Sequence, residues 1–331
     1  MPRAPRVTGP LRLAPEVARA LRSDRPVVAL ESSVLAQGLP IPANREAAER
    51  MIEAVRSRGA VPAITAVVAG VPAVGLTPAE LERFVRREGI AKLSARDIPL
   101  AMAQGRDGAT TVAAALALAR LAGIEVLATG GIGGVHRALD GGSAVRDESA
   151  DLEELARSPM VVVCAGAKSI LDLEGTVERL ETLGVPLVGY GTSELPGFIT
   201  AETGIPIGAR VDAANEVADA YRAQRALGRA QALLVVQPPP ASHALPRSVV
   251  DEAVTEALAR ARREGVRGGA VTPYLLAEVE RVTAGRSLGA NLALLGANAT
   301  LAAEVAAELA RRPGRRHALR GTPRPSGTSK R

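Results

Sequence analysis

The stretch that most constrains the fold runs from Val161 to Leu173 and reads VVVCAGAKSILDL. Its first residues are apolar and mostly β-branched, a pattern typical of a strand that is buried on both faces. Small residues follow as far as Ala167, then comes Lys168, and helical periodicity is expected from Ser169. This order predicts a strand of a parallel α/β sheet with Lys168 at its carboxyl end, where such sheets bind ligands.

Apolar runs with strand character alternate with amphipathic helical runs along most of the 331 residues. This alternation predicts an α/β fold with three layers, α/β/α, around a mostly parallel, mixed central sheet. We expect a loose N-terminal arm over 1–12, a single catalytic domain over 13–310 and a basic disordered tail over 311–331. The expected strands are 26–30, 61–68, 90–94, 124–129, 160–164, 185–190 and 232–236, and the main expected helices are 13–23, 42–59, 112–123, 212–227, 247–264, 272–283 and 291–310.

The net charge of +6 does not indicate a nucleic-acid-binding surface. Residues 311–331 carry eight basic residues and no acid, so the rest of the chain has a formal charge of about −2. Aromatic residues make up only 2% of the chain, whereas single-strand binding depends on aromatic stacking. The single cysteine, Cys164, excludes a disulfide framework and a cysteine-ligated metal site. Without a signal-peptide core or a long apolar run, we predict a cytoplasmic protein with no membrane partner and no specific nucleic-acid partner.

Lysine is scarce in this chain. Of 41 basic side chains only Lys92, Lys168 and Lys330 are lysine, and Lys330 lies in the tail. Unlike arginine, lysine can lose its proton and attack a carbonyl, and partial burial lowers the pKa of its amine. Lys92 and Lys168 are therefore either reactive amines or members of structural ion pairs at strand ends.

Three further segments contain residue types that could support chemistry. Glu31 ends an apolar strand and is followed by two serines, so it is either a proton donor or base, or a cap of the next turn. The TGGIGG run after 124–129 allows close approach by a ligand, although His136 takes the place of the third glycine in a dinucleotide-binding fingerprint. The Gly108–Val112 turn is either a phosphate cradle or an ordinary Thr cap of the next helix.

Polar clusters raise two more possibilities. Asp147, Glu148 and Asp151 precede a helix, where acids are stabilising in any case, but they could also hold Mg²⁺ or Mn²⁺. Asn291 and Asn298 are seven residues apart on the last helix and so share a face, where a polar ligand could meet them.

Several of these motifs occur together in one known family. The runs ALES, AKLS, ATGGIGGVHR, SADLEELA and VVCAGAKSILDL, with the C-terminal SLGANLALLGANATLAAEVA, resemble the pseudouridine-5′-phosphate glycosidase (indigoidine synthase A-like) family. The matching stretches span nearly all of residues 14–310. The resemblance implies reversible cleavage of the C–C glycosidic bond of pseudouridine 5′-phosphate to uracil and ribose 5-phosphate, by a pseudouridylate synthase of the hydro-lyase class.

The resemblance also implies roles for individual residues. It implies that Lys168 is the nucleophile that forms a Schiff base with ring-opened ribose, and that Glu31 is the proton donor. It implies that Asp147 holds Mn²⁺, with Mg²⁺ as a possible substitute, and that the protein is a homotrimer. Substrate contacts are implied for Lys92, Thr111, Val112, His136, Ser149, Ala150, Asp151 and Asn291.

This chain departs from the family pattern at two places. The loop over 137–146 is a few residues longer than usual, and Gln37 stands where the family commonly has histidine. A glutamine can form hydrogen bonds but cannot shuttle a proton near neutral pH. Two other functions stay open from the residues alone: a different phosphosugar C–C lyase, and a nucleotide-binding module without catalysis.

Overall fold

The computed structural model describes residues 11–137 and 147–311. Its main sheet is parallel from β3 through β12, and the antiparallel pairs β3–β4 and β3–β6 make it mixed. Within the described residues, the strand order is β1 (Arg12–Leu13), β4 (Val71–Val74), β3 (Val61–Val68), β2 (Val27–Leu30), β7 (Val126–Ala128), β9 (Val161–Cys164), β13 (Leu233–Val236), β11 (Leu187–Tyr190) and β12 (Arg210–Val211), with β6 (Gly108–Thr110) and β5 (Ala91–Leu93) branching from β3.

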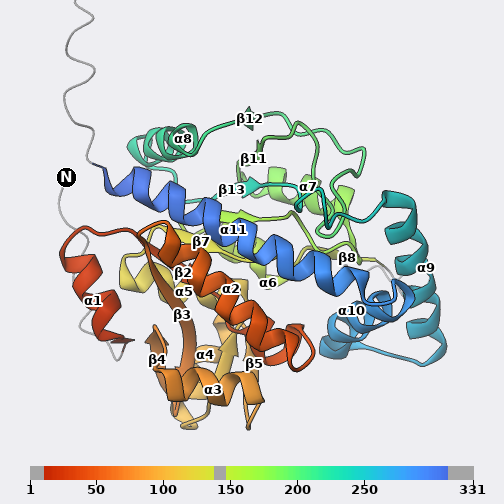
Figure 1. Cartoon of the computed structure of the whole chain (residues 1–331), viewed down its shortest axis with the longest axis horizontal. Coiled ribbons are helices and arrows are strands. Elements are labelled where there is room, and N and C mark those ends of the chain that lie inside the picture. The colour runs from red at the N-terminus through yellow and green to blue at the C-terminus, as the bar shows by residue number, and fades with distance from the viewer. Residues whose placement is uncertain (1–10, 138–146, 312–331) are drawn as a thin grey trace, which may run out of the picture.

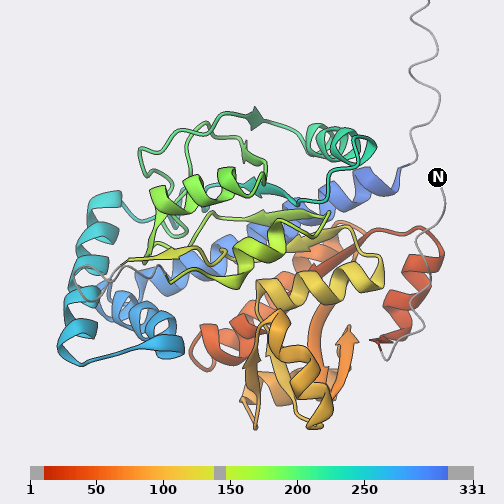
Figure 2. The ribbon, with the colours of Figure 1, turned by 180° about the vertical axis from the view of Figure 1, so that it is seen from behind.

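Helices cover both faces of the sheet, so the prediction of a three-layer α/β/α fold is confirmed. One face carries α2 (Ala43–Ser57), α8 (Ala214–Ala226) and α11 (Arg286–Ala310), which crosses the whole molecule in Figure 1. Seen from behind, α5 (Val112–Ala122), α6 (Ala150–Leu155) and α7 (Leu173–Thr182) lie over the other face (Figure 2). The remaining helices are α1 (Pro15–Arg22), α3 (Pro78–Arg86), α4 (Ile98–Ala103), α9 (Arg247–Arg263) and α10 (Val271–Val282).

The core is built from small aliphatic side chains, as expected for a chain with few aromatics. Strands β2, β9 and β13 are buried along their whole length. Among the described residues, α11 is the one helix long and apolar enough to cross a membrane, and 56% of its most apolar window is buried in the protein. It contacts α2 and strands β2, β7 and β9, so its apolar character is accounted for by packing in the core.

Local sequence signals position several elements correctly. Thr77 and Glu80 form a capping box at the start of α3. Thr111 caps α5, and Gly123 ends it in the left-handed conformation. The last residue of the arm expected over 1–12 is part of the sheet, because Arg12 and Leu13 form β1 and pair with β4.

The helix expected from Ser169 begins instead at Leu173. Between them, β10 (Leu171–Asp172) pairs antiparallel with β8 (Val135–His136). The side chain of Asp172 then accepts a hydrogen bond from the Gly175 N–H at 2.9 Å and caps α7. Pairing between segments that are distant in the sequence therefore overrides helical periodicity here, because the local sequence carries no sign of the β8 partner.

Candidate active site

The candidate site lies at the carboxyl ends of three adjacent parallel strands. Glu31 directly follows β2, Thr129 directly follows β7, and Lys168 follows β9 after a short turn. Because these strands are neighbours in the order β2–β7–β9, their ends open into one cavity of about 550 Å³. This is the sheet edge at which Lys168 was expected to bind a ligand.

All of the residues to which the family resemblance assigns a role line this one cavity. They come from segments that are far apart in the sequence, which only the sheet order brings together. They are Glu31, Lys92, Thr111, Val112, His136, Asp147, Ser149, Ala150, Asp151, Lys168 and Asn291.

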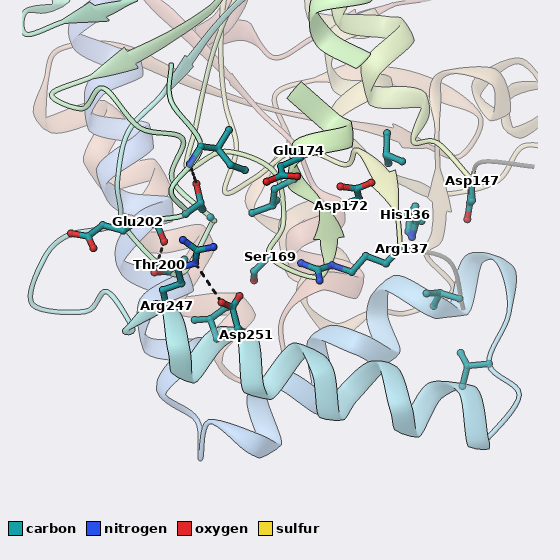
Figure 3. Close-up of a pocket in the computed structure, with 18 of the residues that line it drawn as sticks. His136, Arg137, Asp147, Ser169, Asp172, Glu174, Thr200, Glu202, Arg247 and Asp251 are labelled. Atoms are coloured by element: carbon teal, nitrogen blue, oxygen red, sulfur yellow. Dashed lines mark hydrogen bonds and ion pairs between the residues drawn. The ribbon is translucent and has the colours of Figure 1, made fainter. Parts of the chain in front are cut away.

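A second, larger cavity of about 810 Å³ adjoins the first between α7 and α9 (Figure 3). The two cavities share His136, Asp147 and Gly268. The larger one is lined by neither of the lysines nor Glu31. We therefore place the chemistry in the smaller cavity, where a buried acid and two amines occur together.

Glu31 is buried, with only 7% of its surface exposed. Ser33 Oγ donates a hydrogen bond to Oε2 at 2.5 Å, and Thr129 Oγ1 donates to Oε1. Both carboxylate oxygens are thus oriented by hydroxyl groups rather than by a helix cap, which favours the proton-transfer reading of the sequence over the capping one. The serines after Glu31 are visible in the local sequence, whereas Thr129 is 98 residues away and gives no local signal of this contact.

Lys168 is held by two turns that run side by side. Ile132 and Ala167 form a parallel bridge, and the Lys168 N–H donates to the Ile132 carbonyl at 3.1 Å. Gly166 permits the turn because its φ is +84° and an added Cβ would lie 2.1 Å from the Pro196 carbonyl oxygen. The Nζ of Lys168 donates to the Gly131 carbonyl at 2.7 Å. Among the described residues neither Lys168 nor Lys92 forms an ion pair, which favours the reactive-amine interpretation over the structural ion pair.

Lys92 lies on β5, is exposed and lines the cavity. Desolvation by the surrounding protein lowers the pKa of its amine, and the nearby charge of Lys168 lowers it further. Glu31 and Asp151 oppose this shift. The cavity therefore contains two amines and two acids that are close enough to influence one another.

Asp151 connects the glycine-rich loop to the start of α5. Its Oδ1 accepts from the Ala113 N–H at 2.9 Å and its Oδ2 accepts from the Gly133 N–H at 2.8 Å. Gly133 is required here because an added Cβ would lie 2.2 Å from Ser149 Oγ. The carboxylate of Asp151 is therefore committed to the protein framework.

The start of α5 is capped by Thr111, as the second interpretation of Gly108–Val112 expects. Gly108 to Thr110 form β6, and Thr111 accepts from the Ala114 N–H at 3.4 Å. Within the described part of the chain, the Val112 N–H has no acceptor, and Val112 lines the cavity. One backbone donor at this helix end is thus open to a ligand.

The acidic cluster divides into framework and free groups. Glu148 forms an ion pair with Arg179 at 2.8 Å. Asp147 lies beside His136, whose backbone N–H donates to the backbone carbonyl of Asp147 at 2.9 Å. Burial lowers the pKa of His136 and the two lysines act in the same direction, whereas Asp147 opposes them. The described residues contain no group of three His, Cys, Asp or Glu side chains that could hold a metal, so the donor set suits at most a largely hydrated ion on Asp147.

The two asparagines of α11 have different roles. Asn298 is fully buried and satisfied, because its Nδ2 donates to the Thr129 carbonyl at 2.8 Å and its Oδ1 accepts from Gln237 at 2.9 Å. A ligand contact at Asn298 is therefore excluded. Asn291 Oδ1 is buried without a hydrogen-bond partner and lines the cavity, as do Gln37 Oε1 and Ser94 Oγ.

The chain is similar to several known proteins. The model of a family described as indigoidine synthase A like protein matches residues 16–308. A protein of Gemmatimonas aurantiaca named pseudouridine-5′-phosphate glycosidase is 59% identical over 298 residues, covering 90% of this chain and 96% of its own. One of the same name from Escherichia coli is 46% identical, covering 92% of this chain and 97% of its own. The crystal structure of the prealnumycin C-glycosynthase AlnA in complex with ribulose 5-phosphate superposes with a TM-score of 0.83 at 41% identity, covering 91% of this chain and 97% of that one.

Proposed function

The chain belongs to the indigoidine synthase A-like family, and from this premise we propose that it is a pseudouridine-5′-phosphate glycosidase. The proposed reaction is reversible cleavage of the C–C glycosidic bond, with uracil and ribose 5-phosphate as products. The observation that carries the proposal is that a buried carboxyl group, Glu31, and the amine of Lys168 line one cavity at the ends of neighbouring strands, with Lys168 in no ion pair among the described residues.

We assign covalent catalysis to Lys168. A C–C bond to C1′ needs an electron source at C1′ before it can break, and an amine attached to C1′ supplies one. In the proposed sequence Nζ bonds to C1′ as the C1′–O4′ bond breaks, and O4′ takes the proton that Nζ loses. The nitrogen lone pair then forms an imine to C1′ while uracil leaves, and water releases ribose 5-phosphate and the free amine. The net reaction consumes one water.

We assign proton donation to Glu31. Uracil leaves through C5, which must receive one proton as its bond to C1′ breaks. Glu31 is buried and oriented by Ser33 and Thr129, so its carboxyl group has a fixed position from which to deliver that proton. Proton transfer by a positioned side chain contributes about 10²–10⁴-fold to a rate.

We assign phosphate recognition to Lys92 and to the backbone N–H of Val112. A cation at the cavity mouth and an open amide at a helix N-terminus both favour an anion. Thr111, Ser149 and Ala150 line the same region and are assigned to the ribose phosphate. His136 is assigned to the same wall, next to Asp147.

A divalent metal ion, Mn²⁺ or Mg²⁺, would be held by Asp147 with water completing its shell. When bound, it would supply positive charge beside the substrate phosphate. Asp151 already accepts two backbone hydrogen bonds, and Glu148 is paired with Arg179. Among the described acids of this cluster, we therefore assign only Asp147 as a metal ligand.

A second candidate is synthesis of a C-glycoside from another carbon nucleophile. The similarity to the prealnumycin C-glycosynthase favours it, since that enzyme was crystallised with ribulose 5-phosphate. Both candidates use the same phosphosugar chemistry and differ in the group that is joined to C1′.

The test is a product assay with pseudouridine 5′-phosphate, uridine 5′-phosphate and buffer alone. We expect uracil and ribose 5-phosphate from the first substrate only, and no turnover by Lys168→Arg, which keeps the charge but has no neutral amine. Folding of the variant is checked by its melting temperature. Turnover by Lys168→Arg at the wild-type rate would refute the proposal, and absence of uracil release by the wild type would favour the second candidate.

A further inference from the structure

Three buried polar atoms in the cavity have no hydrogen-bond partner among the residues that the structure describes. They are Gln37 Oε1, Ser94 Oγ and Asn291 Oδ1, and all three residues line the same cavity as Glu31 and Lys168. An unpaired buried acceptor costs about 1–3 kcal/mol, so each such atom in a native protein calls for an explanation. Their position in the cavity suggests that a ligand supplies the missing hydrogen bonds.

The orientation of Gln37 is fixed by the protein. Its Nε2 donates to the Ile90 carbonyl at 3.1 Å, so the amide cannot rotate its oxygen away without breaking that bond. Gln37 lies in the π-helical turn Val34–Gly38, which directly follows the Glu31–Ser33 segment at the end of β2. Turns of this type are enriched at functional sites.

Gln37 and Asn291 also line a third, smaller cavity of about 220 Å³ that adjoins the one containing Glu31 and Lys168. Phe198 and Leu276 line both cavities, so the two amides lie at an apolar junction. A flat ring with polar edges suits such a place, since its faces meet apolar walls and its edge meets acceptors. The phosphate-binding groups assigned above, Lys92 and Val112, line only the larger of these two cavities.

We propose that Gln37 is a specificity residue that accepts a hydrogen bond from a ring N–H of the substrate base through Oε1. The inference rests on the proposed function, because pseudouridine is a C-nucleoside. Its uracil is joined to the sugar at C5, so both N1–H and N3–H are free to donate. In an N-linked uridine N1 carries the sugar and only N3–H remains.

Two unpaired acceptors therefore match the base of a C-nucleoside better than that of an N-nucleoside. With Asn291 taking one N–H and Gln37 the other, pseudouridine 5′-phosphate satisfies both acceptors. Uridine 5′-phosphate leaves one acceptor buried and unpaired. Sites built to bind an N–H reject ligands that lack it, because their own polar groups then stay unsatisfied.

The test compares Gln37→Met, which keeps the length of the side chain but has no amide oxygen, with Gln37→His, whose ring nitrogen can accept. The measured quantity is kcat/KM for pseudouridine 5′-phosphate and for its N1-methyl and N3-methyl derivatives. For the wild type we expect a loss of about 10–100-fold on methylation of the nitrogen that faces Gln37. Gln37→Met should lose about 10–100-fold on the parent substrate and discriminate against that methyl derivative at most weakly, whereas Gln37→His should keep the discrimination.

A second readout separates this inference from the proposed function. Reductive trapping of ribose 5-phosphate on Lys168 involves no base, so its yield should be the same in the wild type and in Gln37→Met. Unchanged kcat/KM in Gln37→Met, or an equal loss on all three substrates, would overturn the role of Gln37. Failure of the wild type to form the adduct would instead count against the proposed function, and binding of uracil, 1-methyluracil and 3-methyluracil to the two proteins would then decide on Gln37 without turnover.

Discussion

At the residue scale, the feature that sets this site apart is an acid held by hydroxyl groups. Thr129 and Ser33 each donate to one oxygen of Glu31, and this carboxylate has no arginine or lysine partner among the described residues. Neutral donors orient a carboxyl group without committing it to a permanent ion pair. Such a group can give up and regain a proton during turnover, which an ion pair would hinder.

Replacement of Thr129 by valine tests this orientation. Valine has nearly the same shape but lacks the hydroxyl group, and a hydrogen bond to a charged acceptor contributes about 1.5–3 kcal/mol. We expect kcat to fall by about 10–100-fold while KM for pseudouridine 5′-phosphate changes less than threefold, measured by steady-state uracil release. Thr65→Val is the matched control, because the buried Thr65 hydroxyl bonds to the Leu30 carbonyl and not to Glu31. An equal fall in kcat for both variants would show that the hydroxyl acts only on packing.

The lowered pKa of Lys92 predicts a pH dependence. Lysine binds an anion while protonated, so a pKa below 10.5 means that the charge is lost at a lower pH than for an exposed lysine. We expect kcat/KM to decline on the alkaline side as Lys92 deprotonates. In Lys92→Arg this decline should move to higher pH, because arginine stays charged, and an unmoved profile would assign the titration to another group.

The same shift predicts an effect on stability. Desolvation at the cavity wall disfavours the charged amine in the folded state, although the Lys92 side chain is exposed, so the unfavourable contribution is small. It is present below the folded pKa and disappears as the pH rises past 10.5. Lys92→Met should therefore unfold at the same temperature as the wild type or higher at neutral pH, while losing substrate affinity. A lower melting temperature would indicate that Lys92 supports the fold.

At the scale of elements, one helix places both catalytic groups. Asn298 on α11 donates to the carbonyls of Thr129 and Gly130, at 2.8 and 3.3 Å. The loop it holds presents the Thr129 hydroxyl to Glu31 and the Gly131 carbonyl to Lys168. The long core helix is thus a positioning element for the site, although Asn298 contacts no ligand.

Asn298→Leu should therefore damage catalysis and stability together. It removes these donors and leaves buried carbonyls unpaired, at a cost of about 1–3 kcal/mol for each group. Tyr221→Phe is the stability control, because the Tyr221 hydroxyl donates to the Pro159 carbonyl before β9, at the opposite end of the sheet. We expect both variants to melt earlier, and only Asn298→Leu to lose more than tenfold in kcat. If Asn298→Leu kept as much of its kcat as Tyr221→Phe, the positioning role of Asn298 would be contradicted.

The sequence predicted the elements with strong local signals and missed those that depend on distant partners. Capped helices such as α3 and buried strands such as β9 follow from residues within the element itself. The strand β10 after Lys168 depends on β8, and the Thr129 contact depends on the order β2–β7, so neither could be read locally. Asn298 was expected to face a ligand because a buried amide is costly, but the protein itself supplies the partners.

At the scale of the whole molecule, the catalytic unit lies within the matched family region. The family model covers residues 16–308. At the end of α11, Arg222 donates a hydrogen bond to the carbonyl of Arg311, the last residue that the structure describes. The disordered nature of the basic tail and the homotrimer stay predictions. The predicted tail falls outside the described residues from residue 312 on.

Removal of residues 312–331 tests whether the tail takes part in catalysis. Because the assigned site residues all precede residue 292, we expect kcat/KM within about twofold of the full chain and an unchanged melting temperature. Light scattering on both proteins would also test the homotrimer, which predicts about three times the chain mass of 34.1 kDa. A truncated chain that loses activity while keeping its melting temperature would place the tail in the reaction.

The most direct test of the mechanism is mass spectrometry of the protein reduced with borohydride in the presence of ribose 5-phosphate. The account predicts one ribitol-phosphate adduct for each chain, located on the peptide that contains Lys168 and absent in Lys168→Arg. An adduct on Lys92 alone, or uracil release by a variant that lacks the Lys168 amine, would contradict it.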